Sequence, residues 1–298
     1  MAAVKASALF SACVRLGDQA GRIIRNVWNS RSLNTFDKSY DNPCTAADLG
    51  SQKIISATLL RYFPGLQIIG EETIEINEND SVEIEPEPLE LFSSSDRDLD
   101  IQRITIWIDP LDGTKNFVMG DLEGVTTLIG VAYDENPIFG VIHQPFGENC
   151  PSYFGGVDVG VWYKTSSNIS QFIPSLSNDF SIASSRLHKS AQGNALLEFL
   201  HPDQVIYADG CGFKSILVLR GQASIYLVDS PFTSKWDICP SVAIMRSLNG
   251  YSVDLNGNSY RFDKETSKAN SNGIIITLNQ SHLNRIIEGW RNFDRSKL

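Results

Sequence analysis

Two carboxylates stand three residues apart at the end of a strongly apolar segment. The segment Ile104–Ile108 has the composition of a buried strand, and Asp109 and Asp112 follow it directly. Pro110 fixes the turn between them. The pair could belong to a simple turn in which an aspartate caps the next helix. It could also bind a hard cation, with the Leu111 carbonyl oxygen as a further ligand. The spacing alone leaves both readings open.

The residues that follow could hold a phosphate. Gly113 permits close approach of the backbone, and Gly113 and Thr114 would present N–H groups at the start of a helix. Such N–H groups favour anions, because the positive end of the helix dipole lies there. A cation site and an anion site would then lie side by side.

Other acidic residues lie at the ends of predicted elements. Glu71 and Glu72 follow the short apolar strand 66–69. Asp237 and Asp48 each lie near the start of a predicted helix. Taken singly, the glutamates could simply begin an acidic loop, and each aspartate could cap its helix or favour its first turn. These residues can form a functional site only if the fold brings them close together.

Helices and strands alternate in a way that predicts layers. Apolar residues recur at helical spacing from Leu9 to Val27, which predicts an amphipathic helix near the N-terminus. A second helix is expected at 48–63, where Pro64 and Gly65 end it. Closely spaced apolar runs then predict an antiparallel sheet, with strands at 104–108, 125–132, 138–143 and 156–163.

The polar stretch 164–178 predicts a boundary between an α+β lobe, residues 1–168, and an α/β lobe, residues 169–298. We expect the active site to lie between the two lobes. In the second lobe we expect strands at 180–184, 204–207, 223–228, 250–254 and 273–277, and helices at 189–200, 213–219, 236–247 and 280–293.

The acidity of the chain belongs to one segment. The 298 residues carry a net charge of −10, and residues 71–100 hold 12 acidic side chains and one basic one, Arg97. Elsewhere the charges nearly balance, so no basic face for polymeric nucleic acid is expected. The insertion 72–100 has few apolar anchors, although its alternation could form a hairpin. We expect it to be mobile, and removal of residues 77–97 to preserve much of the fold.

The five cysteines are scattered, odd in number and without a CxxC pair, which fits reduced thiols and predicts a cytoplasmic protein. No run of about 18 uncharged apolar residues occurs, so no membrane span is expected.

Taken in order along the chain, the acidic elements resemble those of the lithium-sensitive, magnesium-dependent phosphatases of the inositol monophosphatase superfamily. The elements are Gly70-Glu71-Glu72, Asp109-Pro110-Leu111-Asp112-Gly113-Thr114 and Trp236-Asp237. The resemblance spans about residues 5–295. It implies a layered α-β-α-β-α sandwich of two lobes.

Several further segments are similar to the 3'(2'),5'-bisphosphate nucleotidase branch of that superfamily. They are Lys115 after Asp-Gly-Thr and the segments 63–72, 127–133, 141–145, 184–188 and 235–239. Asn116, Phe117 and Pro240 depart from the pattern of the branch. These departures leave the chemistry intact but bear on which substrate is preferred.

The resemblance implies a role for each site residue. The Asp48 and Thr114 side chains would be catalytic, acting together on the attacking water. Two or three Mg²⁺ ions would be bound, and an all-oxygen ligand set independently favours Mg²⁺ over Zn²⁺. The implied metal ligands are Glu71, Asp109, Leu111, Asp112 and Asp237. The implied substrate-binding residues are Gly113, Thr114, Ser185, His188, Gly210, Lys214 and Asp237.

The implied function is a Mg²⁺-dependent phosphohydrolase that removes the 3'-phosphate of adenosine 3',5'-bisphosphate to give AMP. The sulfated analogue and inositol 1,4-bisphosphate are further candidate substrates. The nearest alternative is an inositol monophosphatase or inositol polyphosphate 1-phosphatase. A non-catalytic cation-binding module is the alternative from another class. The expected partner is a phosphorylated small molecule, with a monomer or homodimer as the assembly.

Overall fold

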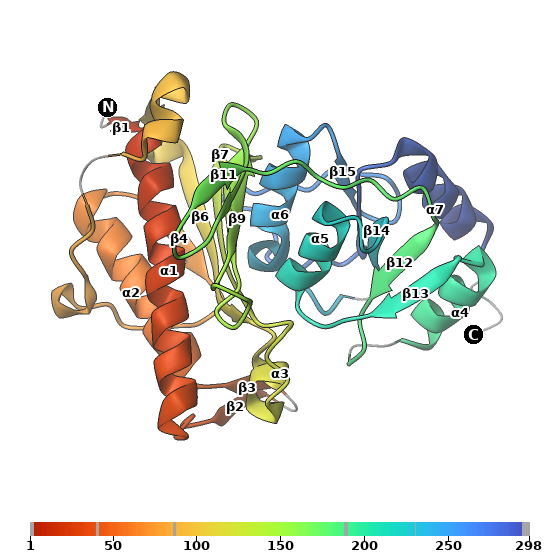
Figure 1. The fold of residues 1–298 in the computed structure, drawn as a ribbon, viewed down its shortest axis with the longest axis horizontal. Coiled ribbons are helices and arrows are strands. Elements are labelled where there is room, and N and C mark those ends of the chain that lie inside the picture. The colour runs from red at the N-terminus through yellow and green to blue at the C-terminus, as the bar shows by residue number, and fades with distance from the viewer. Residues whose placement is uncertain (1–2, 40–41, 86–87, 188–189, 230, 294–298) are drawn as a thin grey trace.

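The computed structural model describes residues 3–39, 42–85, 88–187, 190–229 and 231–293. They form five layers in the order helix, sheet, helix, sheet, helix (Figure 1). This order confirms the layered sandwich that the sequence predicts. No helix among these residues has the length and apolar character needed to cross a bilayer.

The first layer consists of α1 (Ala6–Ser30) and α2 (Ala46–Tyr62), which pack against each other and against one face of the first sheet. Both predicted helices are therefore confirmed. Thr45 caps α2, and its side chain accepts a hydrogen bond of 3.1 Å from the Ala47 N–H. Between the helices, β2 (Phe36–Ser39) and β3 (Asn42–Cys44) form a separate antiparallel ribbon.

The second layer is a seven-stranded sheet in the order β11-β10-β9-β8-β7-β6-β4. Neighbours run antiparallel, as predicted, except that β4 and β6 are parallel. The strands are β4 (Gln67–Gly70), β6 (Ile104–Asp112), β7 (Thr126–Tyr133), β8 (Asn136–His143), β9 (Ser152–Gly156), β10 (Gly160–Lys164) and β11 (Ile169–Gln171).

The prediction of one strand at 156–163 is wrong. β9 and β10 instead pair with each other as a hairpin, with Gly156 opposite Gly160. Gly160 has a φ of +70°, which suits the reversal, and Val157 in the connection is 53% exposed. The apolar run that suggested a single strand is therefore interrupted by a tight turn.

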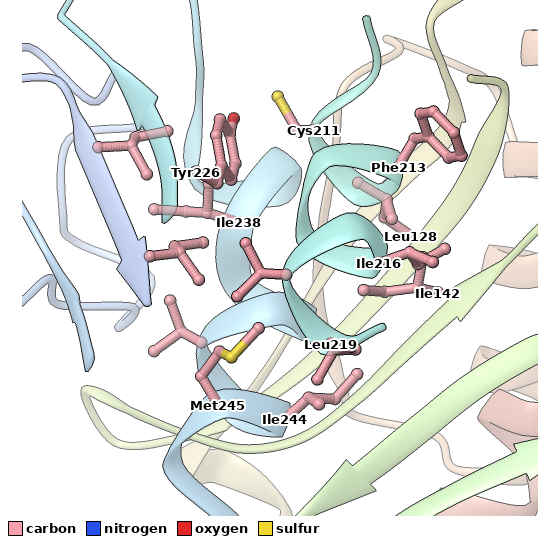
Figure 2. Packing of buried hydrophobic residues seen from close by; sticks show 14 of the residues in the cluster. Leu128, Ile142, Cys211, Phe213, Ile216, Leu219, Tyr226, Ile238, Ile244 and Met245 are labelled. Carbon is pink, nitrogen blue, oxygen red and sulfur yellow. The ribbon is translucent and has the colours of Figure 1, made fainter. Parts of the chain in front are cut away.

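The third layer contains α5 (Cys211–Leu219) and α6 (Lys235–Ser247), and it packs against both sheets. α6 lies closely on the first sheet, since a Cβ at Gly140 would collide with the Pro240 backbone. Figure 2 shows part of the shared core, including Leu128 and Ile142 of the first sheet beside Ile216 of α5. Pro240 therefore has a packing role inside α6.

The fourth layer is a five-stranded sheet, and α4 (Ala191–Leu200) and α7 (Gln280–Asn292) form the fifth layer beside it. Every element predicted after residue 178 is present with ends within two residues. The strand order is β13 (Gln204–Tyr207), β12 (Ser181–Ser184), β14 (Ile225–Val228), β16 (Ile274–Thr277) and β15 (Tyr251–Val253). β12 is parallel to β13 and β14, and the other pairs are antiparallel.

The lobe boundary between residues 168 and 169 stays a prediction. β11 (Ile169–Gln171) still pairs with β10 in the first sheet, and the chain then crosses to β12 in the second. Because α6 contacts strands of both sheets, the two halves share a hydrophobic core rather than meeting at a separate interface.

The described residues of the acidic insertion pack against the body of the protein, contrary to the expectation of a mobile segment, while the effect of removing residues 77–97 stays a prediction. Its described residues form no hairpin. They have 3₁₀ turns at Glu78–Asp80 and Glu90–Ser95, and β5 (Asp98–Asp100) pairs with β1 (Ala3–Lys5). A third 3₁₀ turn, Ile101–Arg103, leads into β6.

Phe92 anchors this insertion. Its side chain is fully buried, and its ring lies 5.9 Å from that of Phe10 and 5.5 Å from that of Phe139. The Glu85 side chain of the insertion remains exposed, where it pairs with Arg15. The insertion is therefore anchored by the buried Phe92 and Leu99, while Val82, Ile84, Leu89 and Leu91 pack partly buried against the same core.

We expect Phe92→Ala to destabilise the protein by about 3–5 kcal/mol, since the substitution removes a buried ring from an aromatic cluster. Denaturant unfolding measures the change in the free energy of unfolding. Ile76→Ala, at a side chain 40% exposed in the same insertion, is the control and should cost much less. Equal stability of the Phe92 variant and the parent protein would contradict this role.

Candidate active site

A cleft of about 650 Å³ opens between the first sheet and the helices and strands of the second half. Ten of the twelve residues predicted for the site line it: Glu71, Asp109, Leu111, Asp112, Gly113, Thr114, Ser185, Gly210, Lys214 and Asp237. The Asp48 side chain lies fully buried behind Thr114. The remaining candidate, His188, lies outside the described residues.

β6 carries the two carboxylates of Asp109 and Asp112, which both line the cleft. The strand continues to Asp112, farther than predicted, and its pairing with β7 shifts register between Asp109 and Asp112. The Leu111 N–H donates to an Asp109 oxygen at 3.1 Å, which fixes that carboxylate. Gly113 follows with a φ of +86° and turns the chain into α3 (Thr114–Met119).

Asp112 joins the two halves of the protein. The N–H groups of Cys211 and Gly212 donate to its oxygens at 2.9 and 2.8 Å, and the Thr126 hydroxyl donates at 2.7 Å. The carboxylate therefore lies at the N-terminus of α5, where a negative charge is favoured. Gly210 allows this approach, because a Cβ there would collide with the Gly124 carbonyl.

Asp48 and Thr114 form the pair that the sequence predicts. The Thr114 hydroxyl lies 2.9 Å from one Asp48 oxygen, while the other oxygen accepts from the Thr45 N–H at 2.8 Å. Burial raises the pKa of Asp48 to about 6, against the opposing effect of these hydrogen bonds. The carboxylate can therefore exchange a proton near neutral pH.

Glu71 and Glu72 share one cation at the end of β4. Lys38 of β2 donates to both carboxylates, at 2.7 and 2.6 Å. Glu72 is buried, and its backbone is held by the Gln52 side chain. Its carboxylate also lies near Cys44 and Asp48, within the one group of possible metal-ligand atoms found among the described residues.

The carboxylates that face the cleft disfavour one another's charge. Burial first, and then repulsion by Glu71 and Asp112, raises the pKa of Asp237 to about 8. Burial likewise raises the pKa of Asp109 well above its ordinary value, with Glu71, Asp112 and Asp237 adding to the effect. Asp237 also caps α6, accepting from the Ser234 N–H at 2.5 Å.

Lys214 is buried in the cleft wall rather than solvated on its helix. Its ammonium group donates to the Gly210 carbonyl at 2.9 Å and lies 5.1 Å from the centre of the Tyr226 ring. Phe232, 60% exposed, also lines the cleft. Neither Tyr226 nor Phe232 belongs to a motif, so neither was predicted from the sequence as a site residue.

Asp209 is a further residue of the cleft that was not predicted from the sequence. This carboxylate accepts from the Arg186 side chain at 2.9 Å and from the Asn116 amide at 3.3 Å, and Arg186 also pairs with Asp121. Asn116, one of the departures noted in the sequence, is thus a contact between α3 and the second half. That departure was the available signal.

Comparisons with known proteins agree with this architecture. The model of the inositol monophosphatase family matches residues 5–292. The 3'(2'),5'-bisphosphate nucleotidase 1 of Dictyostelium discoideum is 32% identical, over 96% of this chain and 96% of that protein. The human protein of the same name is also 32% identical, over 91% and 90%. The mouse Golgi-resident adenosine 3',5'-bisphosphate 3'-phosphatase is 28% identical, over 91% and 76%.

Solved structures show the same fold. The extragenic suppressor protein suhB of Bartonella henselae superposes with a TM-score of 0.73 at 17% identity, covering 96% of this chain and all of that one. Inositol monophosphatase II of Staphylococcus aureus gives 0.68 at 19% identity, covering 95% and 93%. With the family model matching nearly the whole sequence, the chain belongs to the inositol monophosphatase family.

Proposed function

We propose that this protein is a Mg²⁺-dependent phosphatase that removes the 3'-phosphate of adenosine 3',5'-bisphosphate, giving AMP and phosphate. The observation that carries the proposal is one cleft that joins clustered carboxylates to a wall bearing Lys214 and exposed aromatic surface. The names of the relatives support the same substrate. The sulfated analogue and inositol 1,4-bisphosphate are proposed as secondary substrates.

The residues of the cleft fit a hard divalent cation. Asp237 raises the pKa of Asp109, and Glu71 and Asp112 raise that of Asp237, an arrangement that a positive ion among these carboxylates would relieve. Every proposed ligand atom is an oxygen, and oxygen ligands are those that Mg²⁺ prefers. We propose that two or three Mg²⁺ ions are held by Glu71, Asp109, the Leu111 carbonyl, Asp112 and Asp237. When bound, they would supply positive charge that stabilises the phosphoryl group during transfer.

The chain's own residues would orient the attacking water and take its proton. The Thr114 hydroxyl, 2.9 Å from Asp48, would accept a hydrogen bond from the water while donating to that carboxylate. Asp48, with a pKa of about 6, would be the final proton acceptor. The backbone N–H groups of Gly113 and Thr114 would bind oxygens of the reacting phosphate.

The far wall of the cleft favours a nucleotide over an inositol phosphate. Ser185, Gly210 and Lys214 would bind the sugar and the second phosphate. Leu187, Val228, Phe232 and Trp236 supply apolar and aromatic surface in the same cleft. A purine can stack on such a surface, whereas an inositol ring carries hydroxyls all round.

The assembly and compartment are also proposals. The partner would be a phosphorylated small molecule and not polymeric nucleic acid, and the protein would act as a monomer or homodimer. All five cysteines are free and four are buried, which supports a reducing, cytoplasmic setting. One relative is named as Golgi-resident, so a localisation experiment would decide the compartment.

Phosphate release from a panel of substrates tests the function. With Mg²⁺, adenosine 3',5'-bisphosphate should be the best substrate, ahead of inositol 1-phosphate and inositol 1,4-bisphosphate, and chelator should abolish the activity. A preference for inositol 1-phosphate would establish the alternative function. No phosphate release from any of these substrates would favour a cation-binding module.

Asp109→Asn should reduce kcat/KM by about 10³-fold while leaving the fold intact, because it removes a metal ligand without changing side-chain size. Asp109 is a cleaner choice than Asp112, whose oxygens also hold the N-terminus of α5. Asp158→Asn, at an exposed carboxylate distant in sequence, is the control. Activity of the Asp109 variant within a few-fold of the parent protein would refute the ligand role.

The chelator-treated protein should lose stability as pH rises. The folded protein holds a proton on Asp237 up to about pH 8, whereas the unfolded chain releases it near pH 4. The free energy of unfolding should therefore fall between these pH values, by up to about 1.4 kcal/mol per pH unit for each such group.

Thermal unfolding from pH 5 to pH 8 measures this slope. Asp237→Asn, which retains an oxygen that can accept from the Ser234 N–H, should flatten the slope, and Mg²⁺ should raise the melting temperature most at pH 8. The same slope in the variant, the parent and the Mg²⁺-loaded protein would contradict the proposal that the carboxylates repel one another.

Phe232→Ala should raise KM for adenosine 3',5'-bisphosphate about tenfold, since a stacked base contributes roughly 1–3 kcal/mol. Activity on 4-nitrophenyl phosphate, which carries no sugar or purine, should change much less. Phe199→Ala, at a phenylalanine 46% exposed on α4, is the matched control. A proportional loss on both substrates would show that Phe232 supports the cleft rather than the base.

A further inference from the structure

The hydroxyl of Tyr226 is buried and has no hydrogen-bond partner among the residues that the structure describes. Tyr226 lies in β14, and the whole side chain is inaccessible to solvent. Most buried polar atoms in proteins are hydrogen-bonded, because an unpaired one destabilises the folded state. An unpaired buried hydroxyl is therefore a candidate for binding something from outside the protein.

The residue lies in the wall of the cleft described above. Its ring packs into the core shared by the two sheets, and the Lys214 ammonium group lies 5.1 Å from the ring centre. Figure 2 shows its hydroxyl at the same end of α5 as the Cys211 thiol, away from the packed side chains of Ile244 and Met245. The ring thus serves packing, and the hydroxyl is buried in the cleft wall, at the end of α5 that carries Cys211.

The chemistry of this hydroxyl is that of a neutral donor. Burial, and then the neighbouring Cys211, Asp112 and Asp237, raise the pKa of Tyr226 well above its ordinary value. The phenol therefore keeps its proton. The neighbouring Cys211 thiol is only a weak acceptor for this hydroxyl, and Lys214 has no acceptor to offer. Among the described residues, no acceptor oxygen lies within hydrogen-bond distance of this hydroxyl.

We propose that the Tyr226 hydroxyl is a substrate-binding group that donates a hydrogen bond to an oxygen of the sugar or of the second, non-reacting phosphate. This inference rests on the proposed function. Tyr226 comes from β14, in the wall that carries Lys214, whereas the reacting phosphate is expected at Gly113 and Thr114, where β6 ends. The hydroxyl therefore recognises the substrate rather than taking part in the bond cleavage.

The test is Tyr226→Phe, which deletes only the hydroxyl and keeps the ring beside Lys214. The matched control is Tyr260→Phe, whose hydroxyl is bonded to the carbonyls of Val253 and Gly273 at 2.9 and 2.6 Å. Melting temperature of the free protein and kinetics on three substrates are measured for both. The substrates are adenosine 3',5'-bisphosphate, adenosine 3'-phosphate and 4-nitrophenyl phosphate.

We expect Tyr226→Phe to keep or raise the melting temperature, because no internal hydrogen bond is lost, and to raise KM for the bisphosphate about tenfold. Activity on 4-nitrophenyl phosphate should stay unchanged. Tyr260→Phe should lower the melting temperature without changing substrate preference. If adenosine 3'-phosphate shows the same loss, the acceptor is on the sugar. If it shows none, the acceptor is the second phosphate.

Two results would overturn the inference. A lower melting temperature with an equal loss on all three substrates would mean that the hydroxyl is structural, bonded to the Cys211 thiol. Unchanged kinetics on every substrate would mean that it never meets the substrate. Failure of the proposed function differs from both, because the parent protein itself would then not cleave the adenosine substrates. In that case inositol 1-phosphate replaces them, and the same comparison with 4-nitrophenyl phosphate decides the role of Tyr226.

Discussion

Repulsion among buried carboxylates is the constraint on which this structure depends. Glu71, Asp109 and Asp237 reach one cleft from the end of β4, from β6 and from α6, and burial raises the pKa of each. Neighbouring carboxylates add to this effect at Asp109 and Asp237, whereas Lys38 opposes it at Glu71. A fold selected for stability alone would separate these groups or pair each with its own cation. A bound cation would relieve this repulsion, which is the physical reason for expecting a metal ion in the cleft.

The layers of the fold hold these groups against that repulsion. α6 is shared by both sheets and packs directly on the first, where Gly140 leaves room for the Pro240 backbone. Asp112 adds a second connection, because it accepts hydrogen bonds from the first residues of α5. The site thus consists of ends of elements whose positions are fixed by a large common core, which is how a small cluster of like charges can persist in place.

Much of this could be predicted from the sequence, because the carboxylates lie in short motifs at the ends of strongly patterned strands. What could not be predicted depends on contacts between distant segments. Phe92 is buried against three phenylalanines that are distant from it in the sequence, so no local sequence pattern indicates its burial. Tyr226 looks like any strand residue until the strand is placed beside α5. His188, a predicted substrate-binding residue, lies outside the described residues, and its role stays a prediction.

The most direct test of the central claim is the number of protons released when Mg²⁺ binds. Calorimetric titration of the chelator-treated protein at pH 7, repeated in two buffers of different ionisation enthalpy, gives that number. Because burial and repulsion leave carboxyl groups of the cleft protonated in the metal-free protein, binding should release protons into the buffer. Binding without proton release, or no binding at all, would contradict the view that the cleft is built around a cation.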